Sequence, residues 1–178
     1  MKARGIGPFT PVDLAVQCGR PLLLRQPFDP SCFDEVILGC VNVIADEMNP
    51  ARVAALRLGM GEAMVAYTMQ INCGAGMLSI DTGFRRIREG VSDLVLAGGT
   101  EALSHAPLVY SRKAVEWYLR MFSARDLWSR LLAFASVRPS FFKPVIGLER
   151  GLTDPLVDLN MGQTAEIVAH LFLSLIHI

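Results

Sequence analysis

Hydrophobic positions along the chain follow two alternating patterns, which are short continuous apolar runs and longer segments with helical spacing. Three runs are typical of strands that are buried on both faces of a sheet: Val36–Val41, Val65–Ile71 and Asp93–Ala97. The segments between them predict helices. Strands that alternate with helices at this period predict an α/β fold, with a parallel sheet covered by helices on its faces.

Two of the predicted helices begin with a capping residue followed by proline, at Thr10-Pro11 and at Asn49-Pro50. Pro21 lies inside the first helix, which is therefore expected to kink or to end early. A third helix is predicted from 74 to 89, with Gly90 as its left-handed terminator. Its large apolar residues are expected to form the face that packs inward, and these are Met77, Ile80, Phe84 and Ile87.

The segment from 111 to 150 differs in character, since it holds eight basic residues, three acidic residues and seven aromatic residues. It contains no buried-strand pattern and is predicted to be a partly helical insertion outside the sheet. One interpretation is a solvated helical face over a small hydrophobic cluster. The other is a contact surface, because basic residues interleaved with Trp and Phe are typical of interfacial helices.

Composition excludes several classes of protein. The 178 residues include 17 Lys and Arg and 17 Asp and Glu, and 52% are hydrophobic, which excludes a disordered chain. The lack of a basic excess argues against nucleic-acid binding, and no apolar run of about 18 residues predicts a transmembrane segment. Four widely spaced cysteines without a CxxC pair indicate reduced thiols and a cytoplasmic location. No metal site is predicted.

The main chemical candidate is Cys73, which stands at the turn from a predicted strand into a glycine-opened helix. The free amides at a helix N-terminus stabilise a thiolate. Gly74 and Gly76 would leave room for a substrate, or for another helix, beside the sulfur. The alternative is an inert buried Cys73 with glycines that only permit a tight turn. Ser79 stands where a dinucleotide-binding loop needs its third glycine, and Glu101 is predicted to anchor neighbouring backbone.

Four stretches in order resemble the thiolases. The turn Cys73–Gly76 is similar to the family's Cys-Gly-Ser-Gly, with Ala75 in place of serine. Glu35–Gly39 with Asn49–Arg52 resembles an early strand and helix, and Leu96–Ser104 resembles Ala-Gly-Gly-x-Glu-Ser-Met-Ser. The fourth stretch comprises Gly151–Asp154 and Asn160–Glu166. The likeness covers about residues 30 to 170.

The resemblance implies a thiolase-like layered fold, of which this chain is the N-terminal half. Residues 1–110 would form the α/β core without the family's first strand, and 111–170 a helical loop-domain segment. Residues 171–178 match nothing in the family. In thiolases a catalytic histidine and a second cysteine follow in a later part of the chain, so the isolated chain is expected to be an inactive fragment.

The activity implied by the resemblance is acyl transfer between CoA thioesters, in which 3-ketoacyl-CoA is cleaved to acetyl-CoA through an acyl-Cys73 intermediate. The backbone amide of Cys73 would donate to the oxyanion, and Gly74 and Gly76 would shape the turn. Met161 and Asn160 would line the substrate site, although many thiolases have a histidine at the latter position. CoA is a substrate, and neither a metal nor a redox cofactor is required.

The resemblance also implies partners. The intact enzyme is expected to be a homo-oligomer, such as a homodimer, and the length of the 111–150 segment resembles the loop region of thiolases that work with β-oxidation partners. The basic and aromatic residues of that segment make it a candidate surface for CoA phosphates, for a membrane or for a β-oxidation partner subunit. Two alternatives stay open. One is a 3-ketoacyl synthase-like condensing enzyme, and the other is a non-catalytic thiolase-like assembly subunit.

Overall fold

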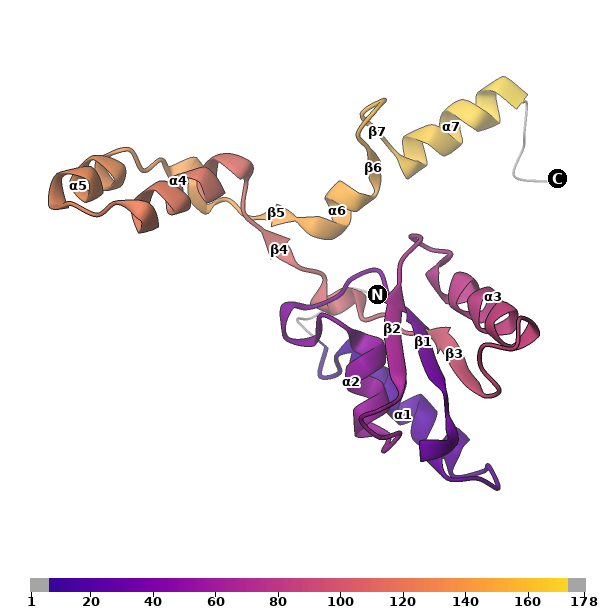
Figure 1. The fold of residues 1–178 in the computed structure, drawn as a ribbon. Coiled ribbons are helices and arrows are strands. Elements are labelled where there is room, and N and C mark those ends of the chain that lie inside the picture. The colour runs from indigo at the N-terminus through magenta and orange to yellow at the C-terminus, as the bar shows by residue number, and fades with distance from the viewer. Residues whose placement is uncertain (1–6, 173–178) are drawn as a thin grey trace. The chain divides into compact units, whose positions relative to one another are not determined.

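The computed structural model describes residues 7–172 and divides the chain into two compact units, Met1–Ala106 and Pro107–Ile178 (Figure 1). This division falls slightly before the predicted boundary at residue 110. The prediction that the family's first strand is missing concerns residues that lie mainly outside the described range. Residues 173–178 of the predicted tail also lie outside that range. Within 7–172, no helix is long and apolar enough to cross a membrane.

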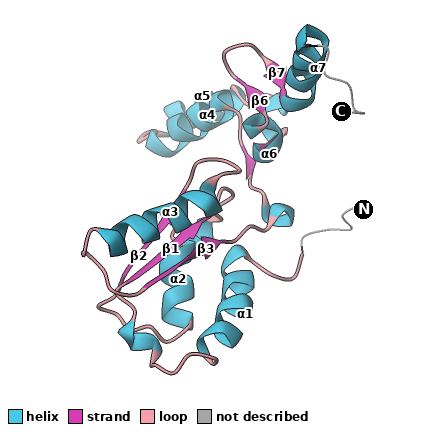
Figure 2. Ribbon diagram, turned by 90° about the vertical axis from the view of Figure 1, so that its right-hand side faces the viewer, coloured by secondary structure: helices cyan, strands magenta, loops and turns pink. Residues whose placement is uncertain are grey.

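The first unit contains a three-stranded parallel sheet with helices on both faces, as predicted. Its strands lie in the order β2-β1-β3. Helices α1 and α2 cover one face and α3 covers the other (Figure 2). The elements in chain order are α1 (Pro11–Leu23), β1 (Glu35–Gly39), α2 (Pro50–Arg57), β2 (Val65–Met69), α3 (Ala75–Arg88) and β3 (Val95–Gly99), with short 3-10 helices at Pro30–Cys32, Ala45–Glu47 and Leu103–His105.

Only the central strand is buried on both faces. All five residues of β1 are buried, whereas most residues of β2 and β3 are partly exposed because these strands form the edges of the sheet. The prediction of three fully buried strands is therefore right for β1 alone. Val36 and Leu38 of β1 point into the core under α1 and α2, where they meet Val12, Ala51 and Ala54.

Local capping signals fix the starts of α1 and α2. The Thr10 hydroxyl accepts from the backbone N–H of Asp13 at 3.1 Å, and the Asp13 carboxylate accepts from the backbone N–H of Thr10 at 3.0 Å. Asn49 caps α2 by accepting from the N–H of Arg52 at 3.2 Å. Both caps confirm the sequence prediction. The expected early end of α1 is wrong, because the helix includes Pro21 in its last turn and continues to Leu23.

Helix α3 packs with the face opposite to the one predicted. Its buried residues are small: Ala75, Ser79 and Gly83. The large residues predicted to face inward, which are Met77, Ile80, Phe84 and Ile87, are instead between 48% and 79% exposed. The helix lies too close to β3 for large side chains, since a Cβ on Gly83 would be 3.2 Å from Cγ1 of Val95. Gly90 has a φ of 69°, which confirms it as the left-handed terminator.

The second unit is largely helical, as predicted, with two short antiparallel strand pairs, β4 with β5 and β6 with β7. Its small core consists of Ala114, Trp117 and Phe141. The indole N–H of Trp117 donates to the carbonyl of Ala133 at 2.7 Å and so ties α4 to α5. The elements are β4 (Leu108–Val109), α4 (Arg112–Ser123), α5 (Leu127–Ala135), a 3-10 helix (Pro139–Phe142), β5 (Val145–Ile146), α6 (Gly147–Gly151), β6 (Thr153–Asp154), β7 (Leu159–Asn160) and α7 (Met161–Phe172).

Candidate active site

Cys73 lies in the turn that leads from β2 into α3, and its side chain is exposed. Two backbone hydrogen bonds close this turn, from Gly74 N–H to Ile71 O and from Ala75 N–H to Asn72 O, both at 3.1 Å. Asn72 has a φ of 48°, a left-handed conformation that asparagine tolerates better than most residues. The interpretation of Cys73 as a buried thiol is therefore wrong. Its position before a helix start agrees with the sequence.

Hydrogen bonds link the loops that leave the three parallel strands. The N–H of Cys40, just after β1, donates to the carbonyl of Met69 at 3.1 Å. The N–H of Thr100, just after β3, donates to the carbonyl of Gly39 at 2.9 Å, and the Gln70 side chain donates to the carbonyl of Val41 at 3.3 Å. Cys73 thus follows the carboxyl edge of the sheet, where ligands of open α/β folds bind.

Glu101 holds the loop after β1 in place. Its carboxylate accepts from the backbone N–H of Val41 at 2.9 Å and from that of Asn42 at 3.1 Å. The prediction that Glu101 anchors neighbouring backbone is confirmed. The same carboxylate lies 3.9 Å from the sulfur of Cys40.

Cys40 is buried, whereas Cys73 is exposed. Burial of the Cys40 side chain, reinforced by the negative charge of Glu101, raises the pKa of the Cys40 thiol to about 12. A thiol with this pKa stays protonated at neutral pH and is a poor nucleophile. The loops after β1 and β2 therefore carry one buried thiol that stays protonated at neutral pH, Cys40, and one exposed thiol, Cys73.

Two glycines allow the first turn of α3 to touch the sheet. Gly39 ends β1, and a Cβ there would lie 2.5 Å from the backbone nitrogen of Gly76. Gly99 ends β3, and a Cβ there would lie 3.0 Å from Cα of Gly76. Gly76 is among the residues that the sequence predicts at the site, whereas Gly39 and Gly99 are not. Gly39 lies inside the predicted strand Val36–Val41, and Gly99 lies two residues after the predicted strand Asp93–Ala97. A glycine in such a place often marks the close approach of another backbone.

Ser79 fastens this turn to the end of β3. Its hydroxyl lies 2.5 Å from the carbonyl oxygen of Gly98 and 2.7 Å from that of Gly76, and the side chain is completely buried. A single hydroxyl has one proton, so the two carbonyls share it. The residue that argues against a dinucleotide-binding loop is therefore part of the support for the Cys73 turn.

Asn160 and Met161, the predicted substrate-lining residues, lie at the start of α7 in the second unit. The Asn160 side chain accepts from the N–H of Gln163 at 2.9 Å, and the Asn160 N–H donates to the Gln163 side chain at 2.9 Å. This reciprocal cap gives Asn160 a structural role. Met161 is exposed. Cys73 and its glycines belong to the first unit, and a substrate role for the α7 residues stays a prediction.

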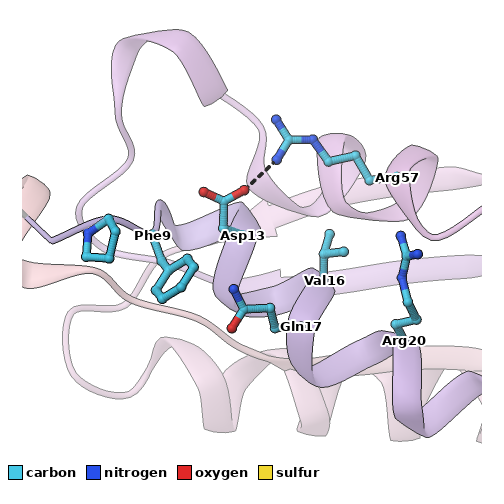
Figure 3. Close-up of a pocket in the computed structure, with 7 residues that line it drawn as sticks. Phe9, Asp13, Val16, Gln17, Arg20 and Arg57 are labelled. Atoms are coloured by element: carbon cyan, nitrogen blue, oxygen red, sulfur yellow. Dashed lines mark hydrogen bonds and ion pairs between the residues drawn. The ribbon is translucent and has the colours of Figure 1, made fainter.

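A hollow of about 440 Å³ on the α1 side of the first unit offers no competing site (Figure 3). An ion pair lies across this hollow, with 2.9 Å between Nη1 of Arg57 and Oδ1 of Asp13. Arg57 also lies 3.5 Å from a carboxylate oxygen of Glu47, so two acidic groups compensate its charge. The lining residues are Pro8, Phe9, Asp13, Val16, Gln17, Arg20 and Arg57, none of which is a nucleophile.

The chain matches a known protein family over most of its length. The family model described as "Thiolase, N-terminal domain" matches residues 6–173. The chain belongs to the thiolase family. The match spans all four of the stretches that resemble thiolases in the sequence.

Individual thiolases and acyltransferases are similar over most of this chain. The 3-oxoadipyl-CoA/3-oxo-5,6-dehydrosuberyl-CoA thiolase of Escherichia coli K12 is 35% identical over 163 residues, which cover 89% of the chain and 36% of that protein. A probable acetyl-CoA acyltransferase of Staphylococcus epidermidis is 30% identical, with 83% and 32% covered. The thiolase chain described here thus spans about a third of the length of these relatives.

Solved structures show the same fold. The acetyl-CoA acetyltransferase of Bacillus anthracis superposes with a TM-score of 0.75 at 30% identity, over 94% of this chain and 38% of the other. Human mitochondrial 3-ketoacyl-CoA thiolase in complex with CoA gives a TM-score of 0.71 at 28% identity, over 93% and 37%.

Proposed function

We propose that the chain is the nucleophile-bearing part of an acyltransferase that acts on CoA thioesters, with Cys73 as the nucleophile. The observation that carries this proposal is the exposed thiol at the start of α3, beside the carboxyl edge of a parallel sheet. Membership of the thiolase family supports it. So does the name of the Escherichia coli relative, which is a thiolase for two CoA thioesters.

The proposed reaction is a thiolytic cleavage in two steps. The Cys73 thiolate attacks the 3-keto carbon of 3-ketoacyl-CoA and forms a C–S bond. The bond between C2 and C3 then breaks, its electron pair remains on C2, and protonation of C2 releases acetyl-CoA. The thiolate of a second CoA attacks the acyl-Cys73 thioester, forms the shortened acyl-CoA and regenerates the Cys73 thiolate. This covalent route divides a difficult bond cleavage into two easier steps.

The turn before α3 supplies the electrostatic part of the proposal. Helix-start N–H groups point toward the residues that precede the helix and favour negative charge there. We propose that the backbone N–H of Cys73 donates a hydrogen bond to the oxyanion of the tetrahedral intermediate. Gly74 and Gly76 add no side chain at this turn, which leaves the thioester a close approach to the sulfur.

Turnover needs two further groups, an acid that protonates C2 and a base that activates CoA. The resemblance assigns them to a second cysteine and a histidine from a later part of the thiolase chain. We therefore propose that these 178 residues alone carry out acyl transfer to Cys73 but no complete cycle. CoA takes part as a substrate, and the proposed steps require no metal or redox cofactor.

The intact enzyme is proposed to be a homo-oligomer in the cytoplasm, as the resemblance implies. All four cysteines are free, which suits a reducing compartment. A thiol titration of the denatured protein, prepared without reductant, should find all four thiols free, which would support the cytoplasmic location. A disulfide would contradict that location.

The half-reaction tests the proposal on the chain as it exists. Incubation with acetyl-CoA should add one acetyl group, and peptide mapping by mass spectrometry should place it on Cys73. The Cys73→Ser variant should take up none. A Cys18→Ser/Cys32→Ser variant is the matched control, because it removes the other two exposed thiols and should be acetylated like the original chain.

Two outcomes would overturn the proposal. One is acetylation spread evenly over Cys18, Cys32 and Cys73, which would indicate chemistry common to any exposed thiol. The other is alkylation of Cys73 by iodoacetamide at a rate that acetyl-CoA does not slow, which would favour the non-catalytic assembly subunit.

A further inference from the structure

Helices α4 and α5 expose eight large apolar side chains. The buried side of α4 holds Ala114 and Trp117, while its other side exposes a second stripe of Val115, Leu119 and Phe122. Helix α5 has no buried residue at all. Its large residues are between 50% and 76% exposed, and they are Leu127, Trp128, Leu131, Leu132 and Phe134. Exposed apolar side chains gathered on two neighbouring helices are typical of an interaction site.

The same helices lie in the only strongly basic part of the sequence. Residues 111–150 hold eight of the 17 basic residues and three of the 17 acidic ones, which leaves nine basic and fourteen acidic residues for the remainder. Arg120, Arg125 and Arg130 are all exposed. Among residues 7–172, no ion pair involves any of the three. Excess positive charge and exposed apolar side chains therefore occur together in residues 111–150.

We propose that residues 112–135, here called the α4–α5 hairpin, form a docking surface for an anionic lipid bilayer. Helices that lie in a membrane interface combine basic residues with exposed Trp, Phe and Leu. Each basic residue near the surface attracts anionic headgroups. Nucleic acid fits less well, because exposed leucines have no role in phosphate contacts.

The size of the hairpin determines how it meets the membrane. Helix α5 has nine residues, which corresponds to a length of about 13 Å, against a hydrocarbon core of about 30 Å. It lies in the interface and does not span the bilayer. The apolar side chains of α5 enter the boundary between headgroups and acyl chains, and the arginines of the hairpin stay among the headgroups.

Tryptophan fluorescence reports on this contact directly. The chain has two tryptophans. Trp117 is buried and hydrogen-bonded, whereas Trp128 is 76% exposed. With vesicles of phosphatidylcholine and phosphatidylglycerol, the full chain should co-sediment and its emission should shift to the blue. Lipids with brominated acyl chains should quench that emission. The Trp128→Phe variant should bind but lose the shift.

Two substituted chains separate the charge from the apolar contact. Arg120→Gln/Arg125→Gln/Arg130→Gln should weaken binding at least about tenfold. Arg20→Gln/Arg85→Gln/Arg88→Gln removes the same charge from exposed positions of the first unit and should bind like the original chain. Leu131→Ser/Leu132→Ser should retain weak electrostatic binding without quenching. All these positions are exposed, and circular dichroism should show that the helices persist in each variant.

Three outcomes would overturn the proposal. Equal binding to vesicles of phosphatidylcholine alone would remove the role of charge. Equal weakening by both arginine triples would remove the role of the hairpin. A lipid-free dimer that Leu131→Ser/Leu132→Ser converts to monomers, together with unchanged vesicle binding by that variant, would show that a second copy of the chain covers the surface.

Discussion

Gly39 and Ala75 are in direct backbone contact, because the end of β1 lies against the first turn of α3. A side chain at Gly39 would overlap the Ala75 carbonyl and come within 2.5 Å of the next backbone nitrogen. Real Cβ atoms do not approach backbone so closely, and backbone cannot move aside as a flexible side chain can. The position of the Cys73 turn therefore requires that residue 39, which lies 34 positions earlier in the chain, has no side chain.

Replacement of Gly39 by alanine should displace the start of α3. We expect a loss of about 1–3 kcal/mol in the free energy of unfolding, from overpacking, and slower acetylation of Cys73. Urea unfolding measures the first effect and mass spectrometry the second. The effect on Cys73 should persist under conditions where the variant is fully folded.

Gly76→Ala is the matched control for this substitution. A Cβ on Gly76 would lie 3.6 Å from Cα of Gly99, an ordinary contact, and alanine favours the helix by about 1 kcal/mol. Stability should be unchanged or slightly higher. If Gly76→Ala proves as damaging as Gly39→Ala, the contact between β1 and α3 does not explain the glycines.

Local signals account for what the sequence predicted well. The caps at Thr10 and Asn49, the terminator at Gly90 and the strand-to-helix turn at Cys73 each depend on neighbours within a few residues. The order of strands and helices follows from apolar runs, which are also local. These features therefore appear in the structure close to where the sequence places them.

Contacts between distant segments account for what was missed. Gly39 and Gly99 support the Cys73 turn through neighbours that are far away in sequence. The buried face of α3 was predicted from its largest apolar residues, which is the usual rule. A helix that approaches a sheet this closely buries its smallest residues instead, and the spacing of Ala75, Ser79 and Gly83 reveals this only once β3 is placed beside it.

The two faces of α3 should respond oppositely to substitution. Gly83→Leu introduces bulk where a Cβ would already be 3.2 Å from Val95 and 3.3 Å from Ala97, and should cost about 1–3 kcal/mol. Phe84→Ser removes a residue that is 61% exposed and should change stability by less than about 0.5 kcal/mol. Urea unfolding of both variants decides this. A larger loss from Phe84→Ser than from Gly83→Leu would mean that α3 packs with its large residues.

Cys40 should react only when the protein unfolds. Its thiol is buried, and a pKa of about 12 keeps it protonated well above neutral pH. In a timed exposure to iodoacetamide at pH 8, the exposed Cys18, Cys32 and Cys73 should be modified first. Denaturant should then expose Cys40 in step with the loss of helical signal. Modification of Cys40 before unfolding would place that thiol in a loop that opens locally.

Stability in acid should depend on a buried carboxylate at the start of β1. Glu35 is 3% exposed and accepts from Arg86 at 2.5 Å, from Ser92 at 2.5 Å and from Tyr67 at 3.3 Å. Burial alone would raise the pKa of Glu35, but the hydrogen bonds from Arg86 and Ser92 and the charge of Arg86 lower it below the ordinary 4.5. The folded chain therefore holds the ionised form more strongly than the unfolded chain does.

The sign of the pH effect follows from linkage. Because the pKa of Glu35 is lowered by folding, its contribution is present above pH 4.5 and is lost as the pH falls below that value. Glu35→Gln should reduce stability at neutral pH by about 1–3 kcal/mol, toward the lower end because the Arg86 side chain is 37% exposed and partly screened. It should also flatten the acid limb of the stability profile. Glu62→Gln, at an exposed position, should leave that limb unchanged. Parallel acid limbs for the original chain and Glu35→Gln, measured by urea unfolding between about pH 7 and pH 3, would show that the pair with Arg86 adds nothing to the pH dependence.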